Sequence, residues 1–215
     1  MPHLALWAGL GMKRASEAPL EIPGVRISWL IPEPPLSDET RSDWIRRMAQ
    51  LVPHDADFIG GFSLGGMLAL EQLTFFPHCR GLVLLSYAAD RNSWQPYLRL
   101  LASSGLLHLL LLIPPRALLR IAIGLMKFFG KNTYRTMSAA LTQWTAVETR
   151  KILHFLLQAR KKELAVPLVQ LIGTKDPWLR PGLDAIPIAG AGHFFFPKYK
   201  NELSRQISHW IKSLV

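Results

Sequence analysis

A serine between two glycines is the clearest chemical motif in the 215-residue chain. Ser63 is the centre of the sequence GFSLG at Gly61–Gly65, a G-x-S-x-G pattern that lies between a strand-like apolar run and a helix-like segment. In that context the chain turns sharply, the glycines leave room for the turn, and the serine hydroxyl projects from the end of the strand. The helix that follows favours negative charge on an attacked carbonyl group. Ser63 is therefore a candidate nucleophile.

A serine nucleophile needs a base and an acid that orients the base, and both occur later in the chain. Asp176 ends the sequence GTKD and His193 ends the sequence GAGH, and each sequence follows a strand-like segment. Open sheets of parallel strands place their sites at the carboxyl ends of the strands, so these side chains are expected to meet there. Asp90 and Asp184 also lie near strand ends, and either is an alternative to Asp176 as the acid.

Alternating strand and helix signals define the elements that would position these residues. Strands are predicted at residues 3–7, 25–30, 58–61, 81–87, 167–172 and 185–189, and helices from an N-cap at Ser37 to 52, over 65–76 and over 203–214. Strands that alternate with helices predict a mostly parallel sheet with helices on both faces. Residues 88–165 break the alternation with helix-rich apolar stretches.

Three motifs occur in the order serine, aspartate, histidine: GFSLGG at 61–66, GTKD at 173–176 and GAGH at 190–193. On these motifs the chain resembles the α/β-hydrolase family over essentially its whole length. The resemblance implies an α/β fold in a reduced form, with about six mostly parallel strands, flanking helices and a helical lid insertion. It places the core at 1–87 and 166–215 and the lid at 88–165. The sequence LWAGLG at 6–11 resembles the loop that supplies a backbone donor to the oxyanion hole. On this basis the backbone amides of Leu10 and Leu64 are candidate oxyanion donors.

The net charge of +10 is concentrated in one part of the chain. Residues 88–165 contain twelve basic and three acidic residues, so this segment carries most of the excess. Such an asymmetry indicates a local surface for an anionic partner, for which Arg116, Arg120 and Lys127 are candidates. An acyl carrier protein, or peripheral contact with an anionic membrane, fits this pattern. Nucleic acid is not favoured, because no nucleic-acid-binding motif is present.

These features predict a serine hydrolase that cleaves a carboxylic ester or thioester of a small acyl substrate through an acyl-enzyme. Within the family, the elbow and the oxyanion loop are similar to those of pimeloyl-acyl-carrier-protein methyl ester esterases, which would place the protein in biotin biosynthesis. The alternatives are a lipase-like esterase at anionic membrane surfaces and a non-catalytic binding module of the same fold.

The remaining composition indicates neither a cofactor nor a metal site. The single cysteine, Cys79, excludes an internal disulfide framework, and the histidines are scattered without ligand spacing. The longest charge-free apolar run, 100–115, is shorter than the roughly 20 residues of a membrane-spanning helix. A cytoplasmic location is the expectation.

Overall fold

The computed structural model describes residues 1–10, 12, 20–104, 106, 112–126, 144–158, 164–196 and 198–215. Its centre is a sheet of six strands in the order β2-β1-β3-β4-β5-β6, and every neighbouring pair is parallel. The strands are β1 (His3–Trp7), β2 (Arg26–Leu30), β3 (Phe58–Phe62), β4 (Gly81–Leu85), β5 (Leu168–Gly173) and β6 (Ala185–Ile188). The predicted α/β architecture of about six mostly parallel strands with flanking helices is confirmed.

The burial of each strand follows its place in the sheet. The central strands β1, β3 and β4 are buried along their whole length, which explains why their sequences are continuous apolar runs. Strand β2 forms an edge and is only partly buried, and its sequence alternates accordingly. Both patterns come from the same rule, that side chains point to opposite faces of the sheet in turn.

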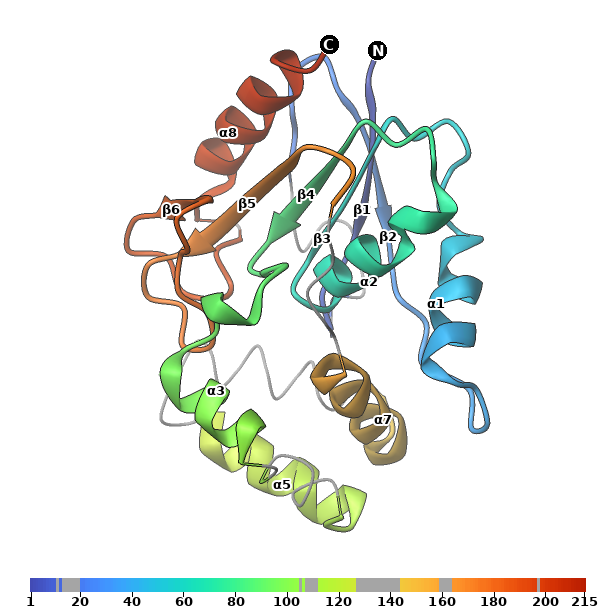
Figure 1. The fold of residues 1–215 in the computed structure, drawn as a ribbon, viewed down its shortest axis with the longest axis vertical. Coiled ribbons are helices and arrows are strands. Elements are labelled where there is room, and N and C mark those ends of the chain that lie inside the picture. The colour runs from blue at the N-terminus through green and yellow to red at the C-terminus, as the bar shows by residue number, and fades with distance from the viewer. Residues whose placement is uncertain are drawn as a thin grey trace.

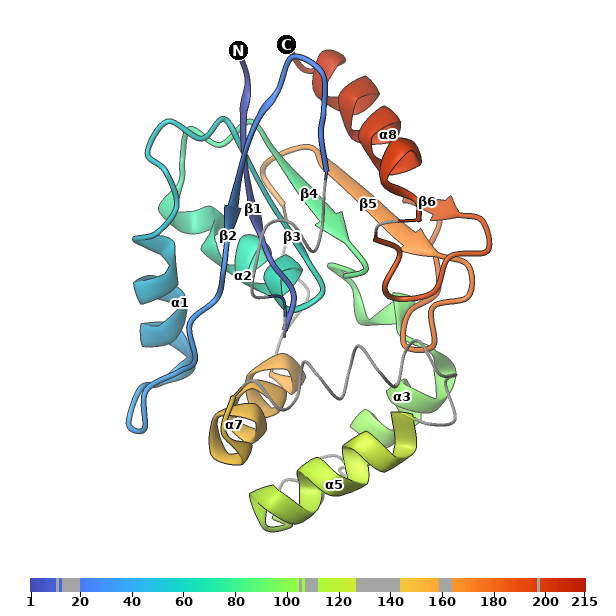
Figure 2. The ribbon, with the colours of Figure 1, turned by 180° about the vertical axis from the view of Figure 1, so that it is seen from behind.

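Helices cover both faces of the sheet (Figures 1 and 2). On one face, α1 (Arg41–Ala49) and α2 (Leu64–Gln72) pack in a core that includes Trp7 and Trp44. On the other, α8 (Lys200–Lys212) buries Leu203, Ile207 and Ile211, which recur every four residues along one side of the helix. Two hydrophobic cores therefore hold the sheet in place from opposite sides.

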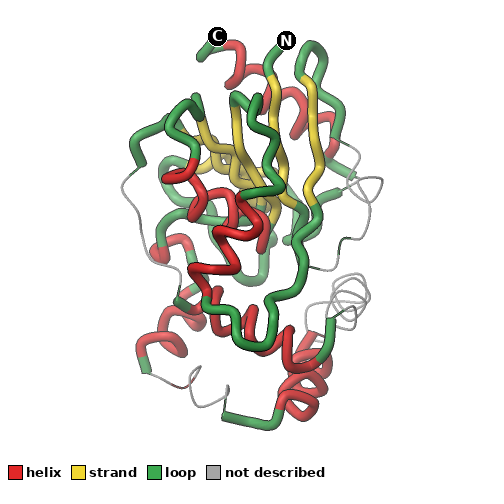
Figure 3. The backbone as a smooth tube through the Cα atoms, turned by 90° about the vertical axis from the view of Figure 1, so that its right-hand side faces the viewer, coloured by secondary structure: helices red, strands yellow, loops and turns green. Residues whose placement is uncertain are grey.

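The described helices of residues 88–165 lie together near the carboxyl ends of the strands, at the end of the molecule away from both termini (Figures 1 and 3). They are α3 (Pro96–Ser103), α5 (Pro115–Met126) and α7 (Ala146–Leu157). Hydrogen bonds tie this segment to the core at both of its ends. Gln95 donates to the carbonyl of Asp176 at 3.0 Å, and Arg41 Nε donates to the carbonyl of Phe155 at 3.2 Å. That these helices act as a lid stays a prediction.

The predicted N-cap of the first helix, Ser37, was wrong. The N-cap of α1 is Thr40, whose side chain accepts a hydrogen bond from the backbone N–H of Asp43. Ser37 lies in the preceding turn and donates its hydroxyl to Asp38 instead. A hydroxyl followed by acidic residues occurs at both positions, so the sequence pattern alone favoured the wrong one. In the described part of the chain, no helix is long and apolar enough to cross a membrane.

Candidate active site

The chain turns sharply at Ser63, which lies between the end of β3 and the first turn of α2. Ser63 has a φ of 52° and caps α2, and its N–H donates to the carbonyl of Leu85 on the adjacent strand at 2.8 Å. The turn brings Gly61 against Gly65 so closely that a Cβ on Gly61 would lie 2.1 Å from the backbone of Gly65. The two glycines of the motif are therefore required by space, as the sequence pattern predicted.

The structure brings Ser63, His193 and Asp176 together from three different loops. His193 Nε2 lies 2.9 Å from Ser63 Oγ, and His193 Nδ1 lies 2.8 Å from Asp176 Oδ2. His193 and Asp176 are buried, with exposed fractions of 5% and 2%. The other oxygen of Asp176 accepts the backbone N–H groups of Trp178 and Leu179 at 2.9 and 3.1 Å. Those two bonds fix the carboxylate so that Oδ2 faces the imidazole.

The two alternative acids lie elsewhere. The carboxylate of Asp90 accepts hydrogen bonds from the backbone and side chain of Asn92 and caps a short 3₁₀ helix, Arg91–Ser93. Asp184 is exposed just before β6. Of the three aspartates, Asp176 is the one whose carboxylate is hydrogen-bonded to His193.

An apolar cavity of about 290 Å³ opens beside Ser63. Aromatic rings form much of its wall, and Trp178 meets the ring of His193 edge to face with 4.4 Å between centroids. The lining residues are Leu10, Phe62, Ser63, Leu64, Ser86, Tyr87, Trp94, Leu98, Leu156, Trp178, Leu179, His193 and Phe194. Among the residues that the structure describes, no Lys, Arg, Asp or Glu side chain lines the cavity, so these walls suit an uncharged group.

Both candidate oxyanion donors line this cavity. Leu64 opens α2, where the first N–H groups of a helix have no partner within the helix. Leu10 follows β1 in the loop that the resemblance singled out. Among the described residues, neither amide donates a backbone hydrogen bond.

Tyr87, also in the wall of the cavity, is partly buried. Burial, together with the nearby Glu71 carboxylate, raises the pKa of the Tyr87 phenol far above its usual range. The Tyr87 phenol is therefore neutral at neutral pH, and it adds no charge to the cavity there.

The candidate contacts for an anionic partner are only partly described. Arg116 and Arg120 are exposed on α5, and Lys127 lies outside the described residues. Within the described ranges, no group of three or more His, Cys, Asp or Glu side chains could hold a metal ion.

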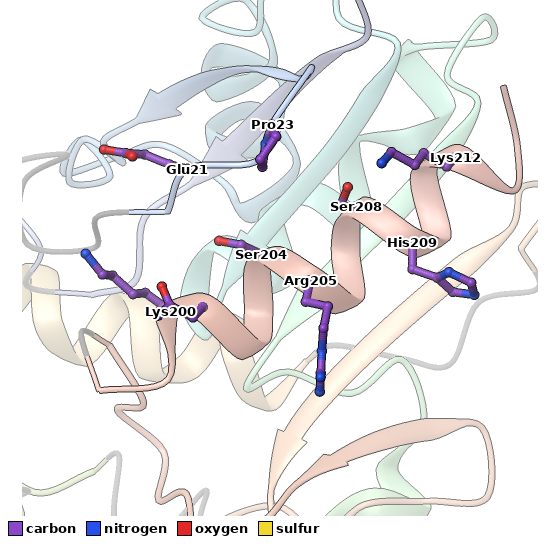
Figure 4. Close-up of a pocket in the computed structure, with 9 residues that line it drawn as sticks. Glu21, Pro23, Lys200, Ser204, Arg205, Ser208, His209 and Lys212 are labelled. Carbon is purple, nitrogen blue, oxygen red and sulfur yellow. The ribbon is translucent and has the colours of Figure 1, made fainter.

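A second cavity, of about 500 Å³, lies along α8 beside Glu21 and Pro23. Its basic groups are spread along the helix and do not converge (Figure 4). Lys200 and Lys212 lie at opposite ends of the row, while Arg205 and His209 point away from Pro23 (Figure 4). None of the predicted site residues lines this cavity.

Several residues at the site had not been predicted from the sequence. Trp94, Leu98 and Leu156 reach the cavity from the segment 88–165, and nothing in their local sequence indicates this. Ser86 did carry a usable signal, because it directly follows a buried strand as Ser63 does, at the edge where such sheets place their sites.

Comparison with known families agrees with this geometry. The sequence matches the alpha/beta hydrolase family model over residues 7–201. The chain belongs to the alpha/beta hydrolase family. The predicted superfamily is thus confirmed, while no curated protein gives a significant match.

Solved structures of alpha/beta hydrolases share the fold. A Burkholderia cenocepacia protein assigned provisionally as an aryl esterase aligns with a TM-score of 0.67 at 14% identity, over 99% of this chain and 90% of its own. The N-acyl homoserine lactonase AidH, complexed with N-butanoyl homoserine, aligns with a TM-score of 0.60 at 17% identity, over 100% of this chain and 90% of its own. The type II thioesterase BorB of the borrelidin biosynthetic cluster aligns with a TM-score of 0.59 at 14% identity, over 97% of this chain and 91% of its own. At these identities the likeness establishes the fold.

Proposed function

We propose that this alpha/beta hydrolase cleaves carboxylic esters or thioesters with Ser63 as nucleophile, His193 as base and Asp176 as the acid that orients the base. One observation carries the proposal: an unbroken series of hydrogen bonds runs from Asp176 through His193 to Ser63 at the wall of an apolar cavity. The comparisons support a hydrolase of this general kind, since an esterase, a lactonase and a thioesterase share the fold.

The proton positions follow from the hydrogen bonds. An ionised carboxylate only accepts, so the Nδ1 of His193 that faces Asp176 carries a proton and Nε2 keeps a free lone pair. When Ser63 Oγ forms a bond to the carbonyl carbon of the substrate, its proton passes to Nε2. The bond to the leaving alcohol or thiol then breaks, and the leaving group takes that proton. Water attacks the acyl-enzyme in the same way, releases the acid and restores the Ser63 hydroxyl.

Negative charge on the substrate oxygen needs donors that are already in place. The backbone amides of Leu64 and Leu10 suit this role because both residues line the cavity and neither amide donates a backbone hydrogen bond among the described residues. The N-terminus of α2 adds a favourable electrostatic potential at the same point. Donors of this kind act mainly on the transition state and so raise kcat.

The cavity limits the acyl group. Its volume of about 290 Å³ lies at the lower end of the roughly 300–1,000 Å³ of small-molecule sites, which favours an acyl group of short to medium length. Because no Lys, Arg, Asp or Glu side chain is found among the described lining residues, a neutral alkyl or aryl acyl group of that size is favoured.

For the part of the substrate outside the cavity we propose an anionic carrier, with an acyl carrier protein favoured. Arg116 and Arg120 support this role, since they are exposed one helical turn apart on α5 and lie on the same side of that helix. Reversing both charges should weaken the hydrolysis of carrier-linked acyl groups and spare a free p-nitrophenyl ester. Equal loss on both substrates would exclude recruitment by charge. Flotation of the protein with anionic but not neutral liposomes would favour the membrane instead.

The hydrolase proposal itself is tested with p-nitrophenyl esters of two to twelve acyl carbons and with a fluorophosphonate probe. We expect turnover that peaks at short to medium chains, and labelling of the wild-type protein that disappears in Ser63→Ala. Folded wild-type protein that neither reacts with the probe nor cleaves any ester would refute it and favour a non-catalytic binding module.

A further inference from the structure

Ser86 occupies a place in the sheet that matches that of the proposed nucleophile. It directly follows β4, just as Ser63 directly follows β3, and the two strands are neighbours with parallel chains (Figure 1). Among the described residues, Ser63 and Ser86 are the two non-glycine residues with a positive φ, which is 52° at Ser63 and 46° at Ser86. Both therefore hold a left-handed backbone conformation that side chains other than Gly, Asn and Asp rarely adopt.

Such a conformation persists where the surrounding structure enforces it. The N–H of Ser86 donates to the carbonyl of Leu171 on β5 at 3.0 Å, and its hydroxyl donates to the main-chain carbonyl of His193 at 2.7 Å. Only 1% of Ser86 is exposed. The left-handed turn thus directs the hydroxyl sideways to the loop that carries His193.

We propose that Ser86 is a positioning residue for the imidazole of His193, an inference that rests on the proposed hydrolase function. The Ser86 hydroxyl fixes the peptide unit that follows the histidine. On the other side, the N–H of Lys175 donates to the carbonyl of Ala191 at 2.8 Å and fixes the chain two residues earlier. With both sides held, the main chain fixes the point from which the imidazole extends, and Asp176 then orients it so that Nε2 lies 2.9 Å from Ser63 Oγ.

Ser86 also lines the cavity, so a direct contact with substrate has to be distinguished from this role. A serine hydroxyl has one proton to donate, and in Ser86 that proton is engaged by the His193 carbonyl. Loss of the hydroxyl should therefore act on the rate of the chemical step and leave substrate binding unchanged.

The experiment compares Ser86→Ala and Ser86→Gly with the control Ser28→Ala. Ala removes the hydroxyl and keeps the strained backbone, whereas Gly removes the hydroxyl and relieves the strain. Ser28 is a matched control because its hydroxyl also contacts a histidine, His3 Nε2 at 2.8 Å, on strands away from the site. We expect kcat on a p-nitrophenyl ester to fall about 10- to 100-fold in both Ser86 variants, with KM nearly unchanged, because misplacement of a catalytic group costs rates of this order. Ser28→Ala should keep wild-type kcat.

A second measurement does not depend on activity. In the proton NMR spectrum, the Nδ1 proton of His193 gives a signal far downfield when it is hydrogen-bonded to Asp176. We expect both Ser86 variants to broaden or shift that signal. The control Ser28→Ala should leave it in place. If the wild type hydrolyses no ester, the proposed function fails, and this signal still tests the role of Ser86. Wild-type kcat in Ser86→Gly, a rise in KM as large as the fall in kcat, or an unchanged signal in both Ser86 variants would overturn the inference.

Discussion

Replacement of Gly65 by alanine should separate the two backbone segments that we propose to bind the oxyanion. A Cβ at Gly65 would lie 2.2 Å from the carbonyl oxygen of Trp7 and 2.7 Å from that of Ala8, and real Cβ atoms essentially never approach closer than 3.0 Å. The first turn of α2 must therefore move away from the end of β1 by at least about 0.8 Å. Leu64 and Leu10, the proposed oxyanion donors, lie on the two segments that move apart.

The cost of this movement can be set against a control in the same chain. Overpacking of a rigid interior costs about 1–3 kcal/mol. Gly124 lies in α5, and a Cβ there would meet no atom of the described residues within 4 Å. Gly124→Ala should thus raise the free energy of unfolding by about 0.5–1 kcal/mol, which is the ordinary benefit of alanine in a helix. Gly65→Ala should lower it by about 1–2 kcal/mol, because part of that benefit offsets the clash.

Urea unfolding and steady-state kinetics on a p-nitrophenyl ester check both variants. We expect Gly65→Ala to lower kcat about 100-fold with little effect on KM, since oxyanion donors act on the transition state and a displacement near 1 Å costs a factor of this order. Gly124→Ala should match the wild type in kcat. A Gly65→Ala protein as stable and as active as the wild type would refute the argument from close packing.

Three further changes have defined outcomes. Gln95→Ala removes a donor to the Asp176 carbonyl, so it should lower the free energy of unfolding by about 1–3 kcal/mol and kcat severalfold, as urea unfolding and ester kinetics would show. Burial raises the pKa of the Cys79 thiol, so iodoacetamide at pH 8 should react slowly with native protein and rapidly in urea, and equal rates would contradict this. Hydrogen bonds from Arg47 lower the pKa of Glu39, so the charged pair stabilises the fold at neutral pH and that stability is lost as pH falls through the lowered pKa. Glu39→Gln should hence cost about 1 kcal/mol at pH 7 and progressively less as the pH falls through the acid range, as measured by urea unfolding at a series of pH values.

The fold was predictable because the extent to which each strand is buried is visible in the pattern of apolar residues along it. The fully buried β3 and β4 appear in the sequence as continuous apolar runs, and the edge strand β2 alternates. Helix ends were harder, since Ser37 and Thr40 both precede acidic residues and only tertiary contacts decide between them. The segment 88–165 gave no usable periodicity beyond its helix-rich apolar character, so which of its residues line the cavity could not be derived.

The site was predictable where one rule fixes both residue type and place. Ser63, Asp176 and His193 follow strands whose carboxyl ends meet at one edge, and local glycines mark all three of those loops. The choice between Asp176 and Asp90 was open in the sequence, because each follows a buried strand. It depends on which carboxylate faces the imidazole, and the two backbone N–H groups that turn Asp176 toward His193 have no sequence signature.

The same site depends on main-chain contacts that motifs do not encode. Ser86 holds the carbonyl of His193, and Gln95 holds the carbonyl of Asp176. Each of these two bonds reaches one member of the proposed triad through its backbone and leaves its side chain free for chemistry. Ser86 comes from the end of β4, whereas Gln95 comes from the entry to α3, which also contributes Leu98 to the cavity. The main chain of the proposed base is therefore held from the sheet, whereas that of the proposed acid is held from the entry to α3 while its carboxylate is held by its own loop.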